Sequence, residues 1–380
     1  MGKIDNSKFI MKLKNIIIKV ITFLGLKPLA LRYISNIVHQ PPFSEADVSD
    51  QKIFSTFTSS SGHQFNLYSG FRDRIKPNWR DMLNENATDY PNANTLKTRL
   101  HAWENRIQGP FKILKNLGFN PIEKIVLEIG AYDGATAYAI SKHGANRVIA
   151  TDYTTYYYNQ LNKENKEFEL YKRETEKLFN LRKSYKTIVT EKYYNNVDFV
   201  EDDICNTTLT ENLADLIVSW EVLEHITEPQ HAIRNIFKAL KPGGWVFHEY
   251  NPFFSIDGGH SPCTLDFPWG HARLNSNDFH RYIETFRKNE KGMALPFYEK
   301  NLNRMTISDL KSYCELAGFE IVALIPWSKK SHLEKITHAL YQQVIENYNT
   351  ASICDLSSPS VWIFMRKPIK SDNTNCTSSK

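Results

Sequence analysis

The sequence predicts an α/β protein built on a doubly wound, mostly parallel seven-stranded sheet with an N-terminal helical cap. From residue 124 onward, short apolar stretches alternate with helical stretches, a pattern typical of βαβ units. A glycine-bearing turn joins the first of these strands directly to a helix. The chain has 380 residues, of which 41% are hydrophobic and 23% charged, so it can bury a large core and does not resemble a disordered chain.

Seven strands are expected in the main domain, which we place at residues 121–368. The first five alternate with helices and therefore form the parallel part of the sheet. The strands are expected at residues 125–129, 147–151, 197–200, 216–219, 245–250, 320–324 and 361–365.

Two parts of this domain are longer than a simple connection requires. Residues 153–196 are rich in Tyr, Lys and Glu, and they are predicted to be an insertion that contains an extra helix. Residues 251–300 begin with Gly, Pro and aromatic residues, and they are predicted to form an extended loop. Because ligands bind beyond the carboxyl ends of parallel strands, this loop is expected to meet the substrate.

The regions outside the main domain differ from it in composition. Residues 41–120 are predicted to form a cap or lid, with a helix over residues 94–117 that Gly109 and Pro110 should break. Residues 369–380 have too little apolar surface to order themselves and are predicted to be a loose tail.

Residues 1–40 carry the basicity of the chain. The formal net charge is +5, yet these forty residues hold seven Lys or Arg against one Asp, so the remainder is close to neutral. Two interpretations stay open for this segment: a basic amphipathic helix in peripheral contact with an anionic membrane or a partner, and a helix that packs on the body. Its apolar stretch is too short to span a bilayer. A nucleic-acid partner is not favoured, because the body lacks a basic groove.

The five cysteines show no CxxC spacing and no even number, so neither a disulfide framework nor a zinc knuckle is indicated. This cysteine usage favours a reducing, cytoplasmic setting, with peripheral membrane contact through residues 1–40 as an option.

The turn after the first strand predicts a nucleoside cofactor. Gly130 and Gly134 supply a turn in which a ligand can touch the main chain. Asp152 follows about twenty residues later at the end of the second strand, where a carboxylate can accept hydrogen bonds from both ribose hydroxyls. Tyr132 occupies a place where dinucleotide-binding turns often have a glycine, so it is expected to crowd the loop.

At these residues the chain resembles the class I S-adenosylmethionine-dependent methyltransferases, whose first strand carries an acidic residue two positions before the first glycine, as Glu128 does here. The resemblance continues through residues 150–152, 197–203, 214–225 and 240–245. It implies a Rossmann-like methyltransferase fold with S-adenosylmethionine as cofactor. The cofactor-binding residues that it implies are Glu128, Gly130, Gly134, Asp152, Asp203, Ile204 and Trp220.

Histidines and carboxylates are the residue types that can take a proton from an oxygen acceptor or hold a metal ion. Glu221, Glu224 and His225 have the spacing of one helical face, and His260 and His271 follow on the predicted loop. We expect catalytic roles for His225, His271 and Glu224, and a possible divalent-metal set of Glu221, Glu224, His225 and His271. The pattern is similar to that of the small-RNA 2′-O-methyltransferases that use a divalent ion, but a Glu-x-x-Glu-His run without a metal also occurs in many small-molecule methyltransferases.

The sequence therefore predicts an S-adenosylmethionine-dependent enzyme that methylates an oxygen of a small molecule or of a glycan or glycolipid precursor. Two alternatives stay open: a metal-dependent RNA 2′-O-methyltransferase, and a scaffold that binds S-adenosylmethionine without turnover.

Overall fold

The computed structural model of the protein describes residues 52–77, 79–80, 92–153 and 166–369. The basic segment 1–40 and residues 370–380 of the predicted tail lie outside the described residues. Among the described helices, none combines the length and the apolar character that a bilayer span requires.

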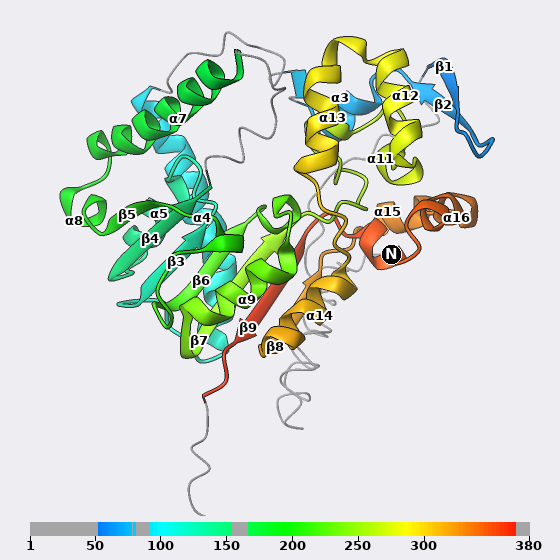
Figure 1. Ribbon diagram of the computed structural model, residues 1–380. Helices are drawn as coiled ribbons and strands as arrows, with labels where there is room; N and C mark the ends of the chain where they lie inside the picture. Colours follow the sequence, from blue (N-terminus) through cyan, green and yellow to red (C-terminus); the bar gives the residue numbers. More distant parts are fainter. Residues whose placement is uncertain (1–51, 78, 81–91, 154–165, 370–380) are drawn as a thin grey trace, which may run out of the picture.

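A seven-stranded sheet forms the centre of the molecule, as predicted (Figure 1). The strand order is β5-β4-β3-β6-β7-β9-β8, and only the pairs that involve β9 are antiparallel. The doubly wound fold class is therefore confirmed. The strands are β3 (Ile125–Ile129), β4 (Arg147–Asp152), β5 (Val197–Glu201), β6 (Ala214–Trp220), β7 (Leu240–Tyr250), β8 (Glu320–Pro326) and β9 (Val361–Arg366).

Helices cover both faces of the sheet. Successive side chains of a strand point to opposite faces, so the apolar side chains of the parallel strands are divided between two cores, one beneath each layer of helices. The covering elements are α4 (Ala93–Asn116), α5 (Ala135–Lys142), α7 (Lys166–Ser184), η3 (Tyr185–Thr187) and α8 (Glu191–Tyr194) on one side, and η4 (Ile204–Asn206), α9 (Pro229–Ala239) and α14 (Ile307–Ala317) on the other. Val126 belongs to the core beneath α4 and α5, whereas Leu127 belongs to the core beneath α9 and α14.

Helix α4 corrects two expectations. It was expected in the cap, but its apolar face packs with α5 against the sheet. It also continues through Pro110 instead of breaking there. Pro110 is buried, and its neighbours Phe111 and Leu114 belong to the core between the helix and the sheet. This packing offsets the roughly 3 kcal/mol that an interior proline costs.

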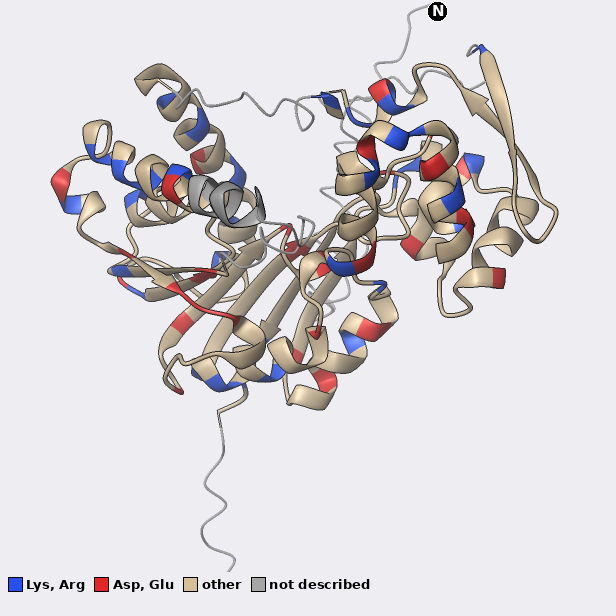
Figure 2. Cartoon of the chain, turned by 45° about the horizontal axis from the view of Figure 1, so that its top comes forward, with Lys and Arg blue, Asp and Glu red and all other residues tan. Residues whose placement is uncertain are grey.

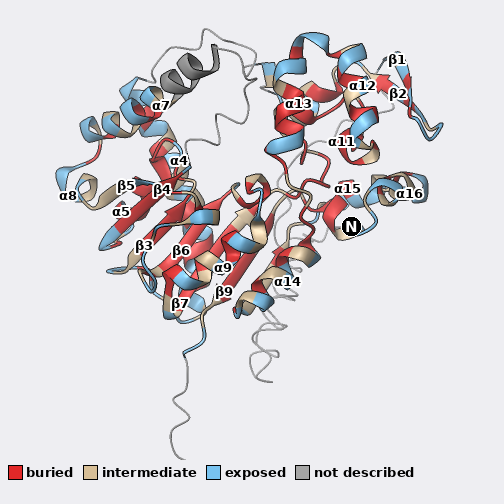
Figure 3. Ribbon diagram, viewed as in Figure 1, coloured by how far each residue is buried: buried red, intermediate tan, exposed pale blue. Residues whose placement is uncertain are grey.

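Three separated segments, residues 53–75, 251–302 and 330–357, form a second hydrophobic core, and we call them the accessory subdomain. Figure 3 shows this core as a second group of buried elements beside the sheet. Its elements are β1 (Ile53–Thr58), β2 (Gln64–Tyr68), α3 (Phe71–Ile75), α10 (His260–Cys263), α11 (Gly270–Arg273), α12 (Ser276–Phe286), η6 (Lys288–Glu290), α13 (Lys291–Lys300), α15 (Lys330–Lys335), α16 (His338–Asn347) and α17 (Ile353–Ser357).

The prediction of an extended loop at residues 251–300 is therefore wrong. The aromatic residues of this stretch are buried, and Phe279 stacks on Tyr298 with ring centroids 3.9 Å apart. This burial stabilises helices where the sequence alone suggested a loop. A helical cap is expected before the main domain, but the first described elements there are the strands β1 and β2. They form a hairpin that packs on this subdomain. The insertion at residues 153–196 does contain an extra helix, α7.

Candidate functional site

A cavity of about 960 Å³ lies at the carboxyl ends of the central strands, with the end of α13 contributing Lys300 and Asn301 to its wall. This is the place where doubly wound sheets bind ligands. Six of the seven residues expected to bind the cofactor line it: Glu128, Gly130, Asp152, Asp203, Ile204 and Trp220.

The turn between β3 and α5 brings the main chain close to its neighbours. Gly130 has φ of 74°, and an ideal Cβ there would lie 2.4 Å from Cγ2 of Val222. Gly134 does not line the cavity; its φ is 84°, and an added Cβ would lie 2.5 Å from Cζ of Phe199. Gly134 is therefore required for packing at the start of α5 and not for ligand contact.

Tyr132, the expected misfit in this turn, adopts a left-handed conformation with φ of 45°. Its side chain is 44% exposed and lies at the wall of the cavity. The turn therefore holds a bulky residue in place of a glycine because its backbone is strained and its ring points toward solvent.

Glu128 is 2% exposed, and its Oε2 has no hydrogen-bond partner among the described residues. Burial, together with the negative charge of Asp152, raises the pKa of Glu128 to about 8. A buried carboxylate with an unsatisfied oxygen is costly unless a cationic or hydrogen-bond-donating ligand compensates it. The indole Nε1 of Trp220 is also buried without a partner in this wall. The orphaned carboxylate oxygen fits a ligand that carries an ammonium group, and the orphaned indole N–H fits a hydrogen-bond acceptor on the same ligand.

Asp152 is held by a residue that the sequence did not reveal. Its Oδ2 accepts a 2.6 Å hydrogen bond from the Arg182 guanidinium, and its Oδ1 accepts one from the Tyr153 backbone N–H at 3.1 Å. Burial raises the pKa of Asp152, and the Arg182 charge opposes that rise. Arg182 comes from α7, and an arginine thirty residues beyond a strand end carries no recognisable spacing signal.

Asp203 caps the short η4 helix at the third strand end. Its carboxylate accepts hydrogen bonds from the Cys205 backbone N–H and the Asn206 side chain, each at 2.9 Å. Ile204, which follows it, is buried and contributes an apolar part of the cavity wall. The Asp203 carboxylate and the apolar Ile204 side chain thus lie next to each other in the cavity wall. Such a pair suits a flat heterocycle with polar edges and apolar faces.

The expected helical face after β6 does not form. Only the 3₁₀ turn η5 (Leu223–His225) follows the strand, and Glu221 lies before it with φ of 56°. The Glu221 carboxylate is instead paired with Arg106 of α4 at 2.7 Å. Glu221 is not among the residues whose ligand atoms gather with those of Glu224 and His225, so the prediction that Glu221 joins them in a metal set is wrong.

His260, and not the expected His271, lies beside Glu224 and His225. Single ligand atoms of Glu224, His225 and His260 all lie within 4.8 Å of one another. His271 is fully buried, and its ring nitrogen Nε2 hydrogen-bonds the Phe253 carbonyl at 2.8 Å. The proposed metal set with Glu221 and His271 is therefore corrected to one with His260.

His225 connects this cluster to the cavity, which its side chain lines. Its Nδ1 donates to the Asn301 carbonyl at 2.7 Å, and its ring centroid lies 4.7 Å from that of His260. Glu224 is 1% exposed, and burial raises its pKa well above the usual range. Asn301 itself is 1% exposed, and both polar atoms of its side chain lack partners among the described residues. Sequence reasoning missed Asn301, since a lone Asn after a helix has no signature.

Comparison with known proteins agrees with this geometry. Residues 100–324, more than half of the chain, match a family described as a methyltransferase domain. A search of curated proteins finds no match.

Solved structures similar to this chain include three methyltransferases. An S-adenosylmethionine-dependent methyltransferase from Mesorhizobium loti is 13% identical with a TM-score of 0.39, over 67% of this chain and 96% of that chain. A Bacillus halodurans methyltransferase is 16% identical with a TM-score of 0.37, over 68% and 97%. Phosphoethanolamine N-methyltransferase 2 from Haemonchus contortus is 16% identical with a TM-score of 0.40, over 76% and 60%. At these identities, none of them assigns an acceptor to this chain.

The family match spans β3 to β8 and contains every strand end that lines the cavity, together with the buried acidic group expected for a cationic nucleoside. The chain belongs to the methyltransferase domain family and is an S-adenosylmethionine-dependent methyltransferase.

Proposed function

We propose that the enzyme methylates a hydroxyl oxygen of a small molecule or of a glycan or glycolipid precursor. S-Adenosylmethionine supplies a methyl group activated by a positively charged sulfur. Glu128 would hold its ammonium group, Asp152 its ribose and Asp203 its adenine, because these carboxylates line one cavity at successive strand ends.

The observation that carries the proposal is that His225 lines the same cavity, and that its ring lies beside Glu224 and His260. An alcohol must lose its proton when its oxygen becomes methylated, so basic groups beside the reacting oxygen help an O-methyltransferase more than they help an N-methyltransferase. The Nδ1 proton of His225 is used by the Asn301 carbonyl, so Nε2 is the nitrogen with the lone pair. The cluster therefore provides the proton-accepting chemistry that oxygen methylation needs.

The acceptor side of the cavity favours a polar molecule. The Asn301 side chain offers two donors and an acceptor that the described residues leave unpaired, and Lys300 beside it adds a cation. Buried amide groups of this kind suit the hydroxyls of a sugar or polyol, because an apolar acceptor would leave them unsatisfied.

The distribution of charge on the described surface supports an RNA acceptor less than a small one. Figure 2 shows acidic residues among the basic ones over both the sheet and the accessory subdomain. RNA-binding surfaces combine a basic track with stacking aromatics. A small acceptor therefore fits the described surface better than a polynucleotide does.

The experiment is transfer of a labelled methyl group from S-adenosylmethionine into extract fractions, followed by nuclear magnetic resonance of the labelled product. A methoxy carbon on a sugar or other small alcohol supports the proposal, whereas label on nitrogen, on carbon or in RNA contradicts it. Calorimetry with S-adenosylmethionine distinguishes the enzyme from the scaffold alternative. A scaffold would bind S-adenosylmethionine but would give no labelled product.

We also propose that residues 1–40 make peripheral contact with an anionic membrane surface. Their excess of basic residues around an apolar stretch supports this. Full-length protein is expected to sediment with vesicles that contain phosphatidylserine, and a chain that lacks residues 1–40 is not; equal sedimentation of the two would contradict the proposal.

A further inference from the structure

The cluster of Glu224, His225 and His260 has the composition and spacing of a cation site. It combines one carboxylate with two imidazoles, and the three ligand atoms lie within 4.8 Å of one another. Ligand atoms around a tetrahedral zinc ion are roughly 3.4 Å apart, because each lies about 2.1 Å from the metal. Small rotations of these side chains would therefore bring them to coordination distance.

Glu224 is the strongest sign of a missing positive charge. Its Oε1 accepts a hydrogen bond from the Asn251 backbone N–H at 3.2 Å, but its Oε2 has no partner among the described residues. The ring nitrogen Nε2 of His260 lies 4.0 Å from Oε1 and is also buried without a hydrogen bond among the described residues. Two buried polar atoms left unsatisfied so close together indicate a ligand that binds both.

His225 is oriented as metal-binding histidines usually are. Such histidines donate one ring N–H to a backbone carbonyl or carboxylate, which fixes the tautomer and directs the other nitrogen to the metal. Here Nδ1 donates to the Asn301 carbonyl at 2.7 Å, so Nε2 carries the lone pair.

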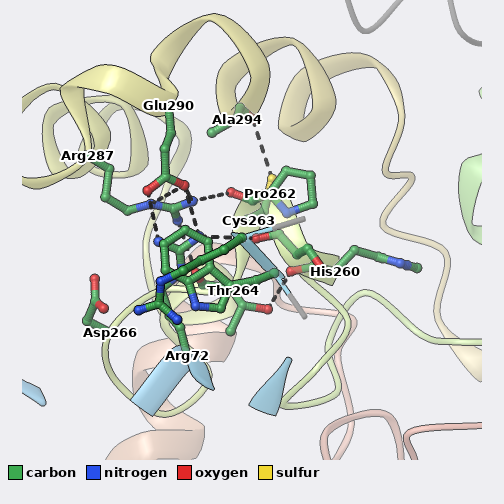
Figure 4. Close-up of polar contacts among 12 residues, drawn as sticks. Arg72, His260, Pro262, Cys263, Thr264, Asp266, Arg287, Glu290 and Ala294 are labelled. Atoms are coloured by element: carbon green, nitrogen blue, oxygen red, sulfur yellow. Dashed lines mark hydrogen bonds and ion pairs between the residues drawn. The ribbon is translucent and has the colours of Figure 1, made fainter. Parts of the chain in front are cut away.

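His260 is held by a buried ion-pair network. Its backbone is strained, with φ of 51°. Arg287 donates to the carbonyls of residues 262 and 264 at 2.8 and 3.0 Å, and Arg72 donates to the carbonyl of residue 261 at 3.4 Å. Glu290 pairs with both arginines, as Figure 4 shows. The network thus fixes the turn that carries His260, which is expected where a strained residue serves a ligand.

We infer that Glu224, His225 and His260 bind one divalent cation of the Zn²⁺ or Mn²⁺ type. Two imidazoles and one carboxylate suit these ions better than Mg²⁺ or Ca²⁺, which prefer oxygen ligands. Three protein ligands leave coordination positions open, and His225 lines the cavity that would receive the acceptor. Because the cation would occupy the lone pair of His225 Nε2, the imidazole would not accept the proton in the metal-bound enzyme. The cation would instead bind the acceptor oxygen and lower the pKa of its hydroxyl, whose proton then passes to water. This role rests on the proposed function, whereas the binding itself does not.

The test is titration of the full chain, first treated with a chelator, with Mn²⁺ by calorimetry and with Co²⁺ by visible absorption. We expect one ion per chain and visible bands from bound Co²⁺. The Glu224→Gln and His260→Gln variants are expected to lose at least tenfold in affinity. His338→Gln is the matched control, because His338 is exposed on α16. It should bind as the unaltered chain does.

The variants are compared by their unfolding temperature and by their affinity for S-adenosylmethionine. Both quantities should be unchanged in Glu224→Gln. Absence of stoichiometric binding by the unaltered chain, or equal binding by Glu224→Gln, overturns the inference. Binding at the cluster in an enzyme that methylates nitrogen would support the site and refute the proposed function. Oxygen methylation that continues at full rate in the metal-free enzyme would overturn the catalytic role of the cation and leave the proposed function standing.

Discussion

The Arg182 guanidinium donates a 2.6 Å hydrogen bond to Oδ2 of Asp152. It donates a second hydrogen bond, at 2.8 Å, to the carbonyl of Tyr132 in the cofactor turn. One side chain of the insertion thus joins the ends of β3 and β4 and supports both the ribose carboxylate and the strained residue beside it.

Arg182→Met is expected to weaken S-adenosylmethionine binding about tenfold. The guanidinium charge is the main influence that opposes the rise of the Asp152 pKa caused by burial. Without it that pKa rises further, and the Tyr132 carbonyl loses its donor. Calorimetry measures the affinity. Lys183→Met, an exposed neighbour on the same helix, should bind as the unaltered enzyme does. Tighter binding by Arg182→Met would mean that Arg182 competes with the ribose and does not support its site.

Cofactor affinity is expected to rise with pH up to about pH 8. Burial holds Glu128 protonated below its pKa of about 8, and the ligand's ammonium group requires the ionised carboxylate. Each pH unit below that pKa should therefore cost up to about tenfold in affinity. Calorimetry from pH 6 to 9 tests this, and the slope should be absent in Glu128→Gln. An equal slope in both proteins would assign the titration to another group.

Gly130→Ala is expected to abolish measurable cofactor binding and to lower the free energy of unfolding by about 2–4 kcal/mol, from left-handed strain and the contact with Val222. Gly62→Ala is the control, because Gly62 has φ of 85° but open space around its Cβ position. It should lose only about 1–2 kcal/mol and keep full affinity. Denaturant unfolding and calorimetry measure the two effects. Similar losses in both variants would refute the role of the close contact.

Glu290→Gln is expected to destabilise the enzyme by about 3–5 kcal/mol at pH 7, because it leaves Arg72 and Arg287 buried without their carboxylate. Burial alone would raise the pKa of Glu290, but hydrogen bonds from both arginines lower it overall. The ion pairs therefore stabilise the enzyme above the unfolded-state pKa of about 4.5, and this contribution disappears as pH falls through the lowered value. Thermal unfolding should show the difference at pH 7 and a smaller one in acid. The exposed Glu284→Gln should melt as the unaltered enzyme does, and a matching loss there would contradict the assignment.

The strands and the cofactor residues could be predicted because their signals are local. Residues 125–129 form a continuous apolar run followed by a glycine turn, and both features lie within ten residues. Asp152 then follows from the length of one βα unit. These inferences need no knowledge of distant contacts.

The accessory subdomain and the histidine cluster could not be predicted in the same way. Phe57, Phe279 and Leu340 share one core, although more than two hundred residues separate the first two. Glu224 meets His260 only because the 251–300 segment folds back over the end of β6, and the left-handed Glu221 breaks the helical spacing. Tertiary contacts of this kind leave no periodic signal in the sequence.

The core of the accessory subdomain has a consequence for biosynthesis. Since it includes Leu356, this core cannot be completed until residue 356 has left the ribosome. The hairpin at residues 53–68 must wait for partners translated some two hundred codons later, among them Phe267 and Tyr282. Until then, its apolar side chains are a natural substrate for chaperones.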